Sequence, residues 1–291
     1  MTSQQNKHGI ITKGVGGLYT VLANGQNYMC KARGLFRNKK GGKNTTPLIG
    51  DAAIIAITDE DKKIGTIHTI EPRKNELLRP PVANIDQVII TVATAQPAFN
   101  AGLLDRFLVL VAYENIPVLI CVNKSDLAGE DTRFAPYIAA GYPLVYTSTV
   151  AGNGLDELKQ HMAGKISVFA GPSGVGKSSL INALSPKLAL ETGELSTKLD
   201  RGKHTTRHSE IFQLSENGGF CVDTPGFSSL EISHIPKKVL GSLFLEMEEY
   251  AGSCRFSDCL HHQERDCAIK EQMGHGVSTA RYESYIKLLQ L

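Results

Sequence analysis

The 291-residue sequence has no tryptophan, no long apolar run and almost no net charge. With 42% hydrophobic and 21% charged residues, it is not a disordered chain, a collagen or a disulfide-dense mini-protein. No stretch approaches the roughly 20 apolar residues of a membrane helix, and the N-terminus has no apolar signal segment. We therefore expect a cytoplasmic protein of two or three domains that binds no membrane.

The net charge of +2 is distributed unevenly along the chain. Residues 1–75 contain 12 basic and 5 acidic residues, residues 76–230 contain 12 and 15, and residues 231–291 contain 7 and 9. Six of the basic residues fall within 31–43, where there is no acidic residue. This segment predicts contact with an RNA backbone, although a solvated hairpin tip would have the same composition.

Two patterns of apolar residues divide the chain. The first 72 residues contain short runs rich in β-branched and aromatic residues, separated by Gly and Asn turns, at 9–14, 17–23, 26–34, 51–58 and 63–70. Five short strands in this length predict a small β-barrel, and the OB-fold is the obvious candidate for an RNA-binding domain at 1–72.

Continuous apolar strands alternate with helices in the second part, which predicts an α/β domain at 73–230 with a parallel sheet covered on both faces. The expected strands are 85–94, 117–123, 143–148, 166–171 and 220–224, and the expected helices are 103–115, 154–164 and 177–185. The remaining residues, 231–291, predict a mainly helical domain.

A glycine-rich turn, GPSGVGKS at 171–178, matches G-x-x-x-x-G-K-[ST] between a predicted strand and a predicted helix. Its glycines let backbone N–H groups surround phosphate oxygens at a helix N-terminus. Lys177 would reach the β- and γ-phosphates, and Ser178 would bind Mg²⁺. The nucleotide-binding residues expected here are Gly171, Pro172, Ser173, Gly174, Val175, Gly176, Lys177, Ser178 and Ser179.

A second motif, DTPG at 223–226, follows an apolar strand 46 residues after Lys177. In this D-x-x-G form, Asp223 can hold Mg²⁺ through water, and the Gly226 N–H can contact the γ-phosphate. Alone, this motif is weak evidence for a nucleotide site. Here it is strong evidence, because it follows a buried strand and a phosphate-binding loop.

A third motif, NKSD at 123–126, is the guanine-recognition tetrapeptide of GTPases. Asp126 would accept hydrogen bonds from the guanine N1–H and N2–H₂, Lys124 would lie along the base, and Asn123 would tie this loop to the phosphate loop. Adenine lacks those donors, so ATP would leave Asp126 unpaired. Ser148 ends the next strand, where GTPases make a backbone contact to the base. If NKSD is a coincidence, the chain is a P-loop ATPase or kinase instead.

The order of these motifs differs from that of standard GTPases, because NKSD and its following strand precede the phosphate loop. Each motif nevertheless ends an apolar strand. A circular permutation produces this order, since it keeps the site and cuts the chain elsewhere.

Three cysteines and one of two adjacent histidines lie close together near the C-terminus, with the spacing C-x₄-C-x-H-x₅-C at 254–267. Three thiolates and an imidazole would form a closed, structural Zn²⁺ site, which would stabilise a segment with little core of its own. Reduced free thiols, or His262 as the histidine ligand, are the alternatives.

The motif order, with RGKHTTRH at 201–208, DTPGFSSL at 223–230 and the Cys/His segment, resembles the RsgA (YjeQ/YloQ) family. These are circularly permuted bacterial GTPases that depend on the small ribosomal subunit. The resemblance covers nearly the whole chain. It implies an N-terminal OB-fold, a permuted GTPase domain that uses GTP with Mg²⁺, and a zinc domain with ligands Cys254, Cys259, His261 and Cys267. It further implies a monomer that binds the 30S subunit and 16S rRNA rather than DNA, with 30S-stimulated hydrolysis in late subunit maturation.

The catalytic group has to lie outside DTPG, because the next residue, Phe227, cannot orient a water molecule as the glutamine of many GTPases does. By resemblance, Thr206 in the polar stretch 197–208 would bind Mg²⁺, and His204 would position or deprotonate the attacking water. A solvated loop histidine is the alternative for His204. A non-enzymatic RNA-binding module switched by the nucleotide is the alternative for the whole chain.

Overall fold

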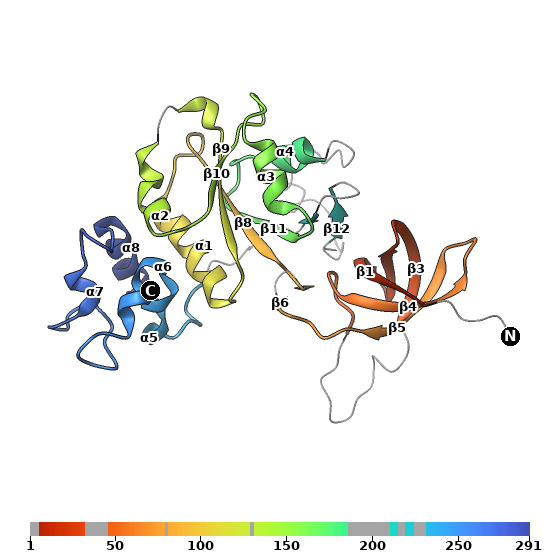
Figure 1. The fold of residues 1–291 in the computed structure, drawn as a ribbon, viewed down its shortest axis with the longest axis horizontal. Coiled ribbons are helices and arrows are strands. Elements are labelled where there is room, and N and C mark those ends of the chain that lie inside the picture. Colours follow the sequence, from red (N-terminus) through yellow and green to blue (C-terminus); the bar gives the residue numbers. More distant parts are fainter. Residues whose placement is uncertain are drawn as a thin grey trace, which may run out of the picture. The chain divides into compact units, whose positions relative to one another are not determined.

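The computed structural model describes residues 6–32, 46–78, 81–128, 131–185, 210–214, 219–223 and 231–291 (Figure 1). Contacts within the chain group it into two units. The first contains 1–86, 161–169 and 184–226, and the second contains 87–160, 170–183 and 227–291. The domain boundaries at 72/73 and 230/231 stay predictions.

A closed five-stranded barrel forms the N-terminal part of the first unit (Figure 1). Strand β1 pairs antiparallel with both β2 and β4, and the ring continues through β2–β3, β3–β5 and β5–β4. Its core includes Ile11, Val21, Tyr28, Ile55 and Ile67. All five predicted strands are present, and the predicted OB-fold barrel is confirmed. The strands are β1 (Asn6–Val15), β2 (Leu18–Ala23), β3 (Gln26–Ala32), β4 (Ala52–Asp59) and β5 (Ile64–Ile70).

The chain leaving the barrel is fixed to it by a buried ion pair. The Nε and Nη2 atoms of Arg73 donate to the two oxygens of the fully buried Asp51 carboxylate, at 2.6 and 2.8 Å. A two-stranded ribbon follows, made of β6 (Glu76–Leu78) and β7 (Pro81–Ala83). The sequence pattern did not predict this ribbon, because its strands are only three residues long.

The first unit also contains β12 (Glu210–Gln213), β13 (Phe220–Asp223) and all but the last residue of β11 (Ile166–Ala170). Strands β11 and β13 are parallel, as predicted, but β12 runs antiparallel to β13. The sheet is therefore mixed. Strand β12 was missed because it is short and follows a long polar stretch.

Three parallel strands of the second unit, β8 (Gln87–Ala93), β9 (Val118–Asn123) and β10 (Leu144–Tyr146), were predicted from their apolar runs. Every residue of β8 is buried, which is why its sequence does not alternate. The helices of this region are α1 (Ala101–Tyr113), α2 (Ala135–Ala139), α3 (Leu155–Met162) and α4 (Lys177–Leu184), with short 3-10 turns η2 (Ser125–Leu127) and η3 (Thr132–Phe134).

The C-terminal segment of the second unit is helical, as predicted, but its helices are short. Extended backbone at Phe244 interrupts the helical backbone between residues 243 and 245. The elements are α5 (Lys237–Leu240), η5 (Gly241–Leu243), α6 (Leu245–Ala251), α7 (Ala268–Glu271) and α8 (Thr279–Leu289). Among the described residues, no helix is long and apolar enough to cross a membrane.

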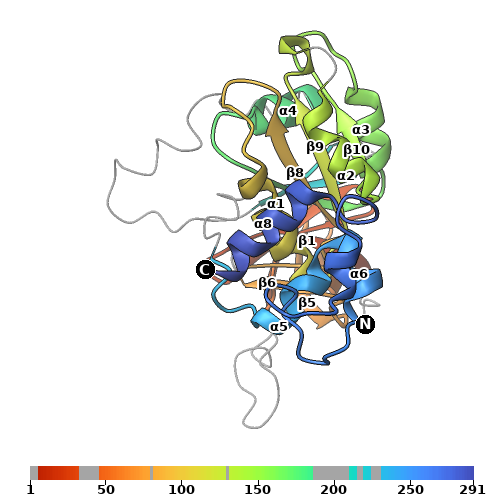
Figure 2. The ribbon, with the colours of Figure 1, turned by 90° about the vertical axis from the view of Figure 1, so that its left-hand side faces the viewer.

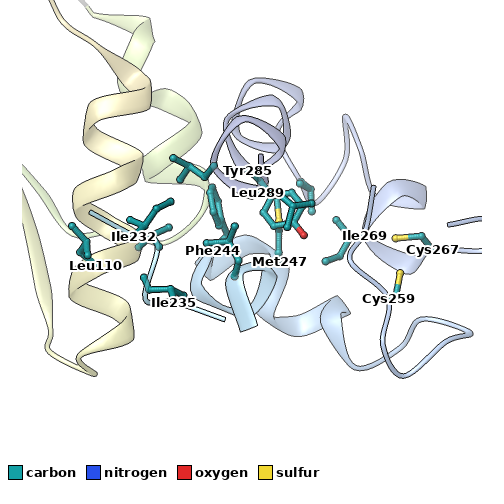
Figure 3. Packing of buried hydrophobic residues seen from close by; sticks show 14 residues of the cluster. Leu110, Ile232, Ile235, Phe244, Met247, Cys259, Cys267, Ile269, Tyr285 and Leu289 are labelled. Atoms are coloured by element: carbon teal, nitrogen blue, oxygen red, sulfur yellow. The ribbon is translucent and has the colours of Figure 1, made fainter. Parts of the chain in front are cut away.

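Helix α1 shares a hydrophobic core with this C-terminal segment. Val109 and Leu110 of α1 pack in one buried cluster with Phe244, Met247 and Tyr285 (Figure 3). Helix α8 also packs against α1 (Figure 2). The same buried cluster extends to Cys259 and Cys267. The cysteine segment is thus continuous with a core that includes a helix of the α/β region.

Candidate functional site

The glycine-rich loop at 171–178, called the phosphate loop below, has the backbone geometry of a phosphate cradle. Gly171, Gly174 and Gly176 have φ angles of +136°, +79° and +96°. A Cβ atom on Gly171 would lie 2.1 Å from the backbone oxygen of Thr91, and one on Gly176 would lie 2.4 Å from Asn123 Nδ2. Both positions therefore require glycine, for backbone conformation and for space.

Lys177 points back over the phosphate loop from the first residue of α4. Its Nζ donates to the carbonyl oxygens of Gly171 and Pro172, at 2.8 and 2.7 Å. Burial lowers the pKa of Lys177, because the ammonium is removed from water. A partly desolvated cation among backbone dipoles is suited to a phosphate group.

The NKSD segment at 123–126, called the base loop below, is joined to the phosphate loop by Asn123. This side chain is 1% exposed, and its Nδ2 donates to the Val175 carbonyl oxygen at 2.9 Å. Its Oδ1 accepts a 3.1 Å hydrogen bond from Thr147 Oγ1. The contact of Asn123 with the phosphate loop is the one that the sequence predicted, whereas the role of Thr147 was missed.

Lys124 and Asp126 lie on the same loop. Lys124 has a left-handed backbone with φ of +60°, and its Nζ donates to the carbonyl oxygens of Gln96 and, at 2.8 Å, Gly174. Ser148 Oγ donates to Asp126 Oδ1 at 2.5 Å and accepts from the Ala151 N–H at 3.0 Å. Ser148 thus orients the carboxylate that would read the base.

An apolar cavity of about 180 Å³ borders the phosphate loop. Its walls come from the loop residues Pro172 and Val175, from β8, from the segment 97–100 and from α1, which contributes Leu103, Leu104 and Phe107. Asn100 caps α1 here, since its Oδ1 accepts from the Leu103 N–H at 3.0 Å. Helix α1 and the phosphate loop thus line the same cavity.

Four predicted site groups cannot be placed. Asp223 ends β13, but its side chain lies outside the described part of the structure. Gly226, His204 and Thr206 also lie outside the described residues. Their roles stay predictions.

The structure brings the side chains of Cys254, Cys259, His261 and Cys267 together, with their ligand atoms within 4.8 Å of one another. The Sγ atoms of Cys254 and Cys267 are 3.9 Å apart, and His261 Nδ1 lies 3.4 and 3.5 Å from them. Tetrahedral Zn²⁺ with ordinary bond lengths requires about 3.8 Å between sulfurs and about 3.6 Å from sulfur to nitrogen. The group, called the Cys/His cluster below, therefore fits zinc, and His262 is exposed and outside it.

Burial disfavours charged side chains in the Cys/His cluster. Burial raises the pKa of the Cys259 thiol to about 12, so a thiolate here needs a positive partner. Burial also lowers the pKa of His261, which favours the neutral imidazole that a metal requires.

The loop around the cluster is held by residues that carried no sequence signal. The Glu264 carboxylate accepts from the N–H groups of Leu260 and His262, each at 2.8 Å. Tyr282 of α8 donates to the His261 carbonyl oxygen at 2.7 Å, and Tyr285 donates to that of Leu260 at 2.5 Å. Helix α8 thus orients the backbone of the ligand loop.

Metal removal is expected to unfold this loop. Structural zinc contributes on the order of 10 kcal/mol to folding. Cys267→Ser should therefore leave the segment around 252–270 open to limited proteolysis. Elemental analysis of this variant should find less than one zinc per chain. His262→Ala, next to the ligand His261, is the matched control and should keep both zinc and protection. Equal zinc content in the two variants would contradict the assignment.

The parallel strands, the glycine cradle and the base loop together define a P-loop GTPase fold in which base recognition precedes phosphate binding along the chain. A family model described as "RsgA GTPase" matches residues 70–233, and one described as "RsgA N-terminal domain" matches 8–67. The chain belongs to the RsgA GTPase family, and it is a GTPase.

Related sequences and related crystal structures support the same family assignment. A protein of Alkaliphilus metalliredigens named "Small ribosomal subunit biogenesis GTPase RsgA" is 47% identical over 285 residues, covering 97% of this chain and 96% of the relative. The protein of the same name from Geobacillus thermodenitrificans is 46% identical with the same coverage. The crystal structure of YloQ, described as a circularly permuted GTPase, has a TM-score of 0.82 at 35% identity, covering 100% of this chain and 96% of that one. YjeQ from Thermotoga maritima has a TM-score of 0.83 at 37% identity, covering 98% of both chains. The expected permutation is confirmed.

Proposed function

We propose that this GTPase acts in small ribosomal subunit biogenesis, where it binds the 30S subunit through 16S rRNA and hydrolyses GTP when the subunit stimulates it. The name that these relatives carry supports the biological process. The observation that carries the chemistry is the hydrogen bond from Asn123 to Val175, which joins the base loop to the phosphate loop. A guanine nucleotide that contacts both loops would span this bond.

In this site, Asp126 accepts hydrogen bonds from the guanine edge. The hydrogen bond that Ser148 donates to this carboxylate holds it in place. Lys124 lies along the base, and Lys177 pairs with the β- and γ-phosphates. Ser178 and Thr206 would hold Mg²⁺, with Asp223 acting through water. The bound ion would neutralise charge on the β- and γ-phosphate oxygens.

The water that attacks the γ-phosphate in line needs a group to orient it. Phe227 has no hydrogen-bonding side chain, so the group must lie elsewhere. From the resemblance to the family we assign this role to His204, with the Gly226 N–H at the γ-phosphate. The polar stretch that contains His204 would be ordered by the 30S subunit. Slow turnover without ribosomes follows from this assignment.

Turnover of purified protein distinguishes an enzyme from a nucleotide-switched binding module. Multiple turnovers of GTP, with ATP consumed far more slowly, are expected in the presence of Mg²⁺ and 30S subunits. A single stoichiometric binding event with no phosphate release would support the binding module. Equal use of ATP would support a P-loop ATPase or kinase.

The rRNA contact is assigned to the barrel, since residues 1–75 hold 12 basic against 5 acidic residues. The basic segment 31–43 extends from the end of β3, although residues 33–45 lie outside the described part. Its lysines and arginines would bind phosphate groups, so affinity should fall with salt.

Neutralising this segment is expected to weaken 30S binding. Changing Arg37, Lys39, Lys40 and Lys43 to glutamine removes up to four phosphate contacts and should lower the log–log salt slope by up to about 3 to 4. Sedimentation with 30S subunits at several salt concentrations measures this. The matched control changes four exposed lysines elsewhere to glutamine, namely Lys159, Lys237, Lys238 and Lys287. If both variants bind equally well, the basic segment is a solvated surface.

A further inference from the structure

Arg281 of α8 is a fully enclosed cation, with 2% of its surface exposed. Its Nε donates to Glu246 Oε1 at 2.6 Å, and its Nη1 donates to Asp105 Oδ1. The guanidinium carbon also lies 4.8 Å from the ring centre of Tyr137 and 4.7 Å from that of Phe244. Arginine keeps its charge, so separating these partners would strand a charge away from water.

The partners of Arg281 come from three different segments of the second unit. Asp105 lies in the middle of α1, Tyr137 lies on α2, and Glu246 lies on α6. Tyr142, between α2 and β10, places its hydroxyl 3.5 Å from Arg281 Nη2 and accepts from a backbone N–H of α6 at 3.5 Å. One side chain thus joins the α/β region to the C-terminal segment.

The first connection leads to the base loop. Tyr142 stands just before β10, and β10 runs directly into Thr147 and Ser148. These two hydroxyls donate to Asn123 and Asp126 of the base loop. Strand β10 pairs in parallel with β9, so a shift of Tyr142 along β10 would reach both base-loop contacts.

The second connection leads to the phosphate loop. On either side of Asp105 along α1, Leu104 and Phe107 line the apolar cavity together with Pro172 and Val175. Val175 also accepts the hydrogen bond that joins the two loops. A shift of α1 at Asp105 would therefore change the wall that faces the phosphate loop across this cavity.

The third connection leads to the Cys/His cluster. The residues after Arg281 on α8 include Tyr282 and Tyr285, whose hydroxyls hold the carbonyl oxygens of His261 and Leu260. The helix that carries the buried cation is thus the helix that orients the ligand loop.

We propose that Arg281 is a positioning residue for the nucleotide site and couples it energetically to the Cys/His cluster. The inference rests on the proposed nucleotide and zinc sites. Coupling between two binding sites is reciprocal, so a nucleotide that binds the ordered site raises zinc affinity by the same factor as zinc raises nucleotide affinity.

The test measures zinc affinity of the full-length protein by competition with a zinc-selective chelator, with and without saturating GDP. In the wild-type protein GDP should raise zinc affinity about fivefold or more. Arg281→Lys keeps a positive charge but loses the planar fork, so GDP affinity should fall about tenfold and the effect of GDP on zinc should vanish. Lys287→Met, an exposed cation removed from the same helix, is the control and should behave as wild type.

The outcomes distinguish a failure of the proposed function from a failure of the coupling alone. If wild-type protein does not bind GDP, the proposed function fails. If it binds GDP but its zinc affinity is the same with and without GDP, only the coupling is overturned. Arg281→Lys with normal GDP affinity and an unchanged GDP effect also overturns it. The wild-type measurement needs no substitution, so the coupling is testable even if the variant does not fold.

Discussion

Asp126→Asn is expected to reduce affinity for GTP by at least about a hundredfold and to create affinity for XTP. The carboxylate would accept from guanine N1–H and N2–H₂, whereas an amide would present an N–H₂ group that matches the extra carbonyl of xanthine. Ser148 Oγ, at 2.5 Å, would still orient the substituted side chain. Competition binding and hydrolysis with GTP, XTP and ATP measure the change.

The matched control is Asp156→Asn on α3, which makes the same chemical change at an exposed position outside the site. It should leave nucleotide preference as it is. If Asp126→Asn also keeps GTP preference, then NKSD is a coincidental match, and a P-loop ATPase or kinase becomes the better interpretation.

His204→Ala is expected to keep GTP binding and to lose ribosome-stimulated hydrolysis by about 10²- to 10⁴-fold, the usual range for removing a general base or a water-orienting group. Binding should persist because Asp126, Lys177 and the glycine cradle are unchanged. Fluorescent-nucleotide titration measures binding, and phosphate release with 30S subunits measures hydrolysis.

His208 lies in the same polar stretch, and His208→Ala is the control for His204→Ala. It should retain most of the stimulated rate. Normal stimulated turnover in His204→Ala would show that His204 is a solvated loop residue and that another group orients the water.

Features with a local signature were predictable from the sequence. Apolar runs without alternation indicated β8 and β9, because both faces of these strands are buried. The G-x-x-x-x-G-K-S spacing predicted a loop that only glycine can form, and the tie from Asn123 to this loop followed from the motif. The permuted motif order was visible because each motif keeps its own strand.

Features that depend on distant partners were not predictable. Arg281 and Asp105 are 176 residues apart, and a single arginine in an amphipathic helix has no signal that distinguishes a buried cation from a surface one. The hydrogen bond from Thr147 to Asn123 joins two strands whose register the sequence does not show. Geometry also resolved the choice between adjacent histidines, since His261 joins the cysteines and His262 is exposed.

The most direct measurement of the central claim is steady-state GTP hydrolysis by the full-length protein alone, with 30S subunits and with 50S subunits. We expect slow turnover alone, stimulation by 30S of about a hundredfold or more, and little effect of 50S, because the proposal has the small subunit order the catalytic stretch. Equal rates in all three reactions, or stimulation by 50S as strong as by 30S, would contradict it.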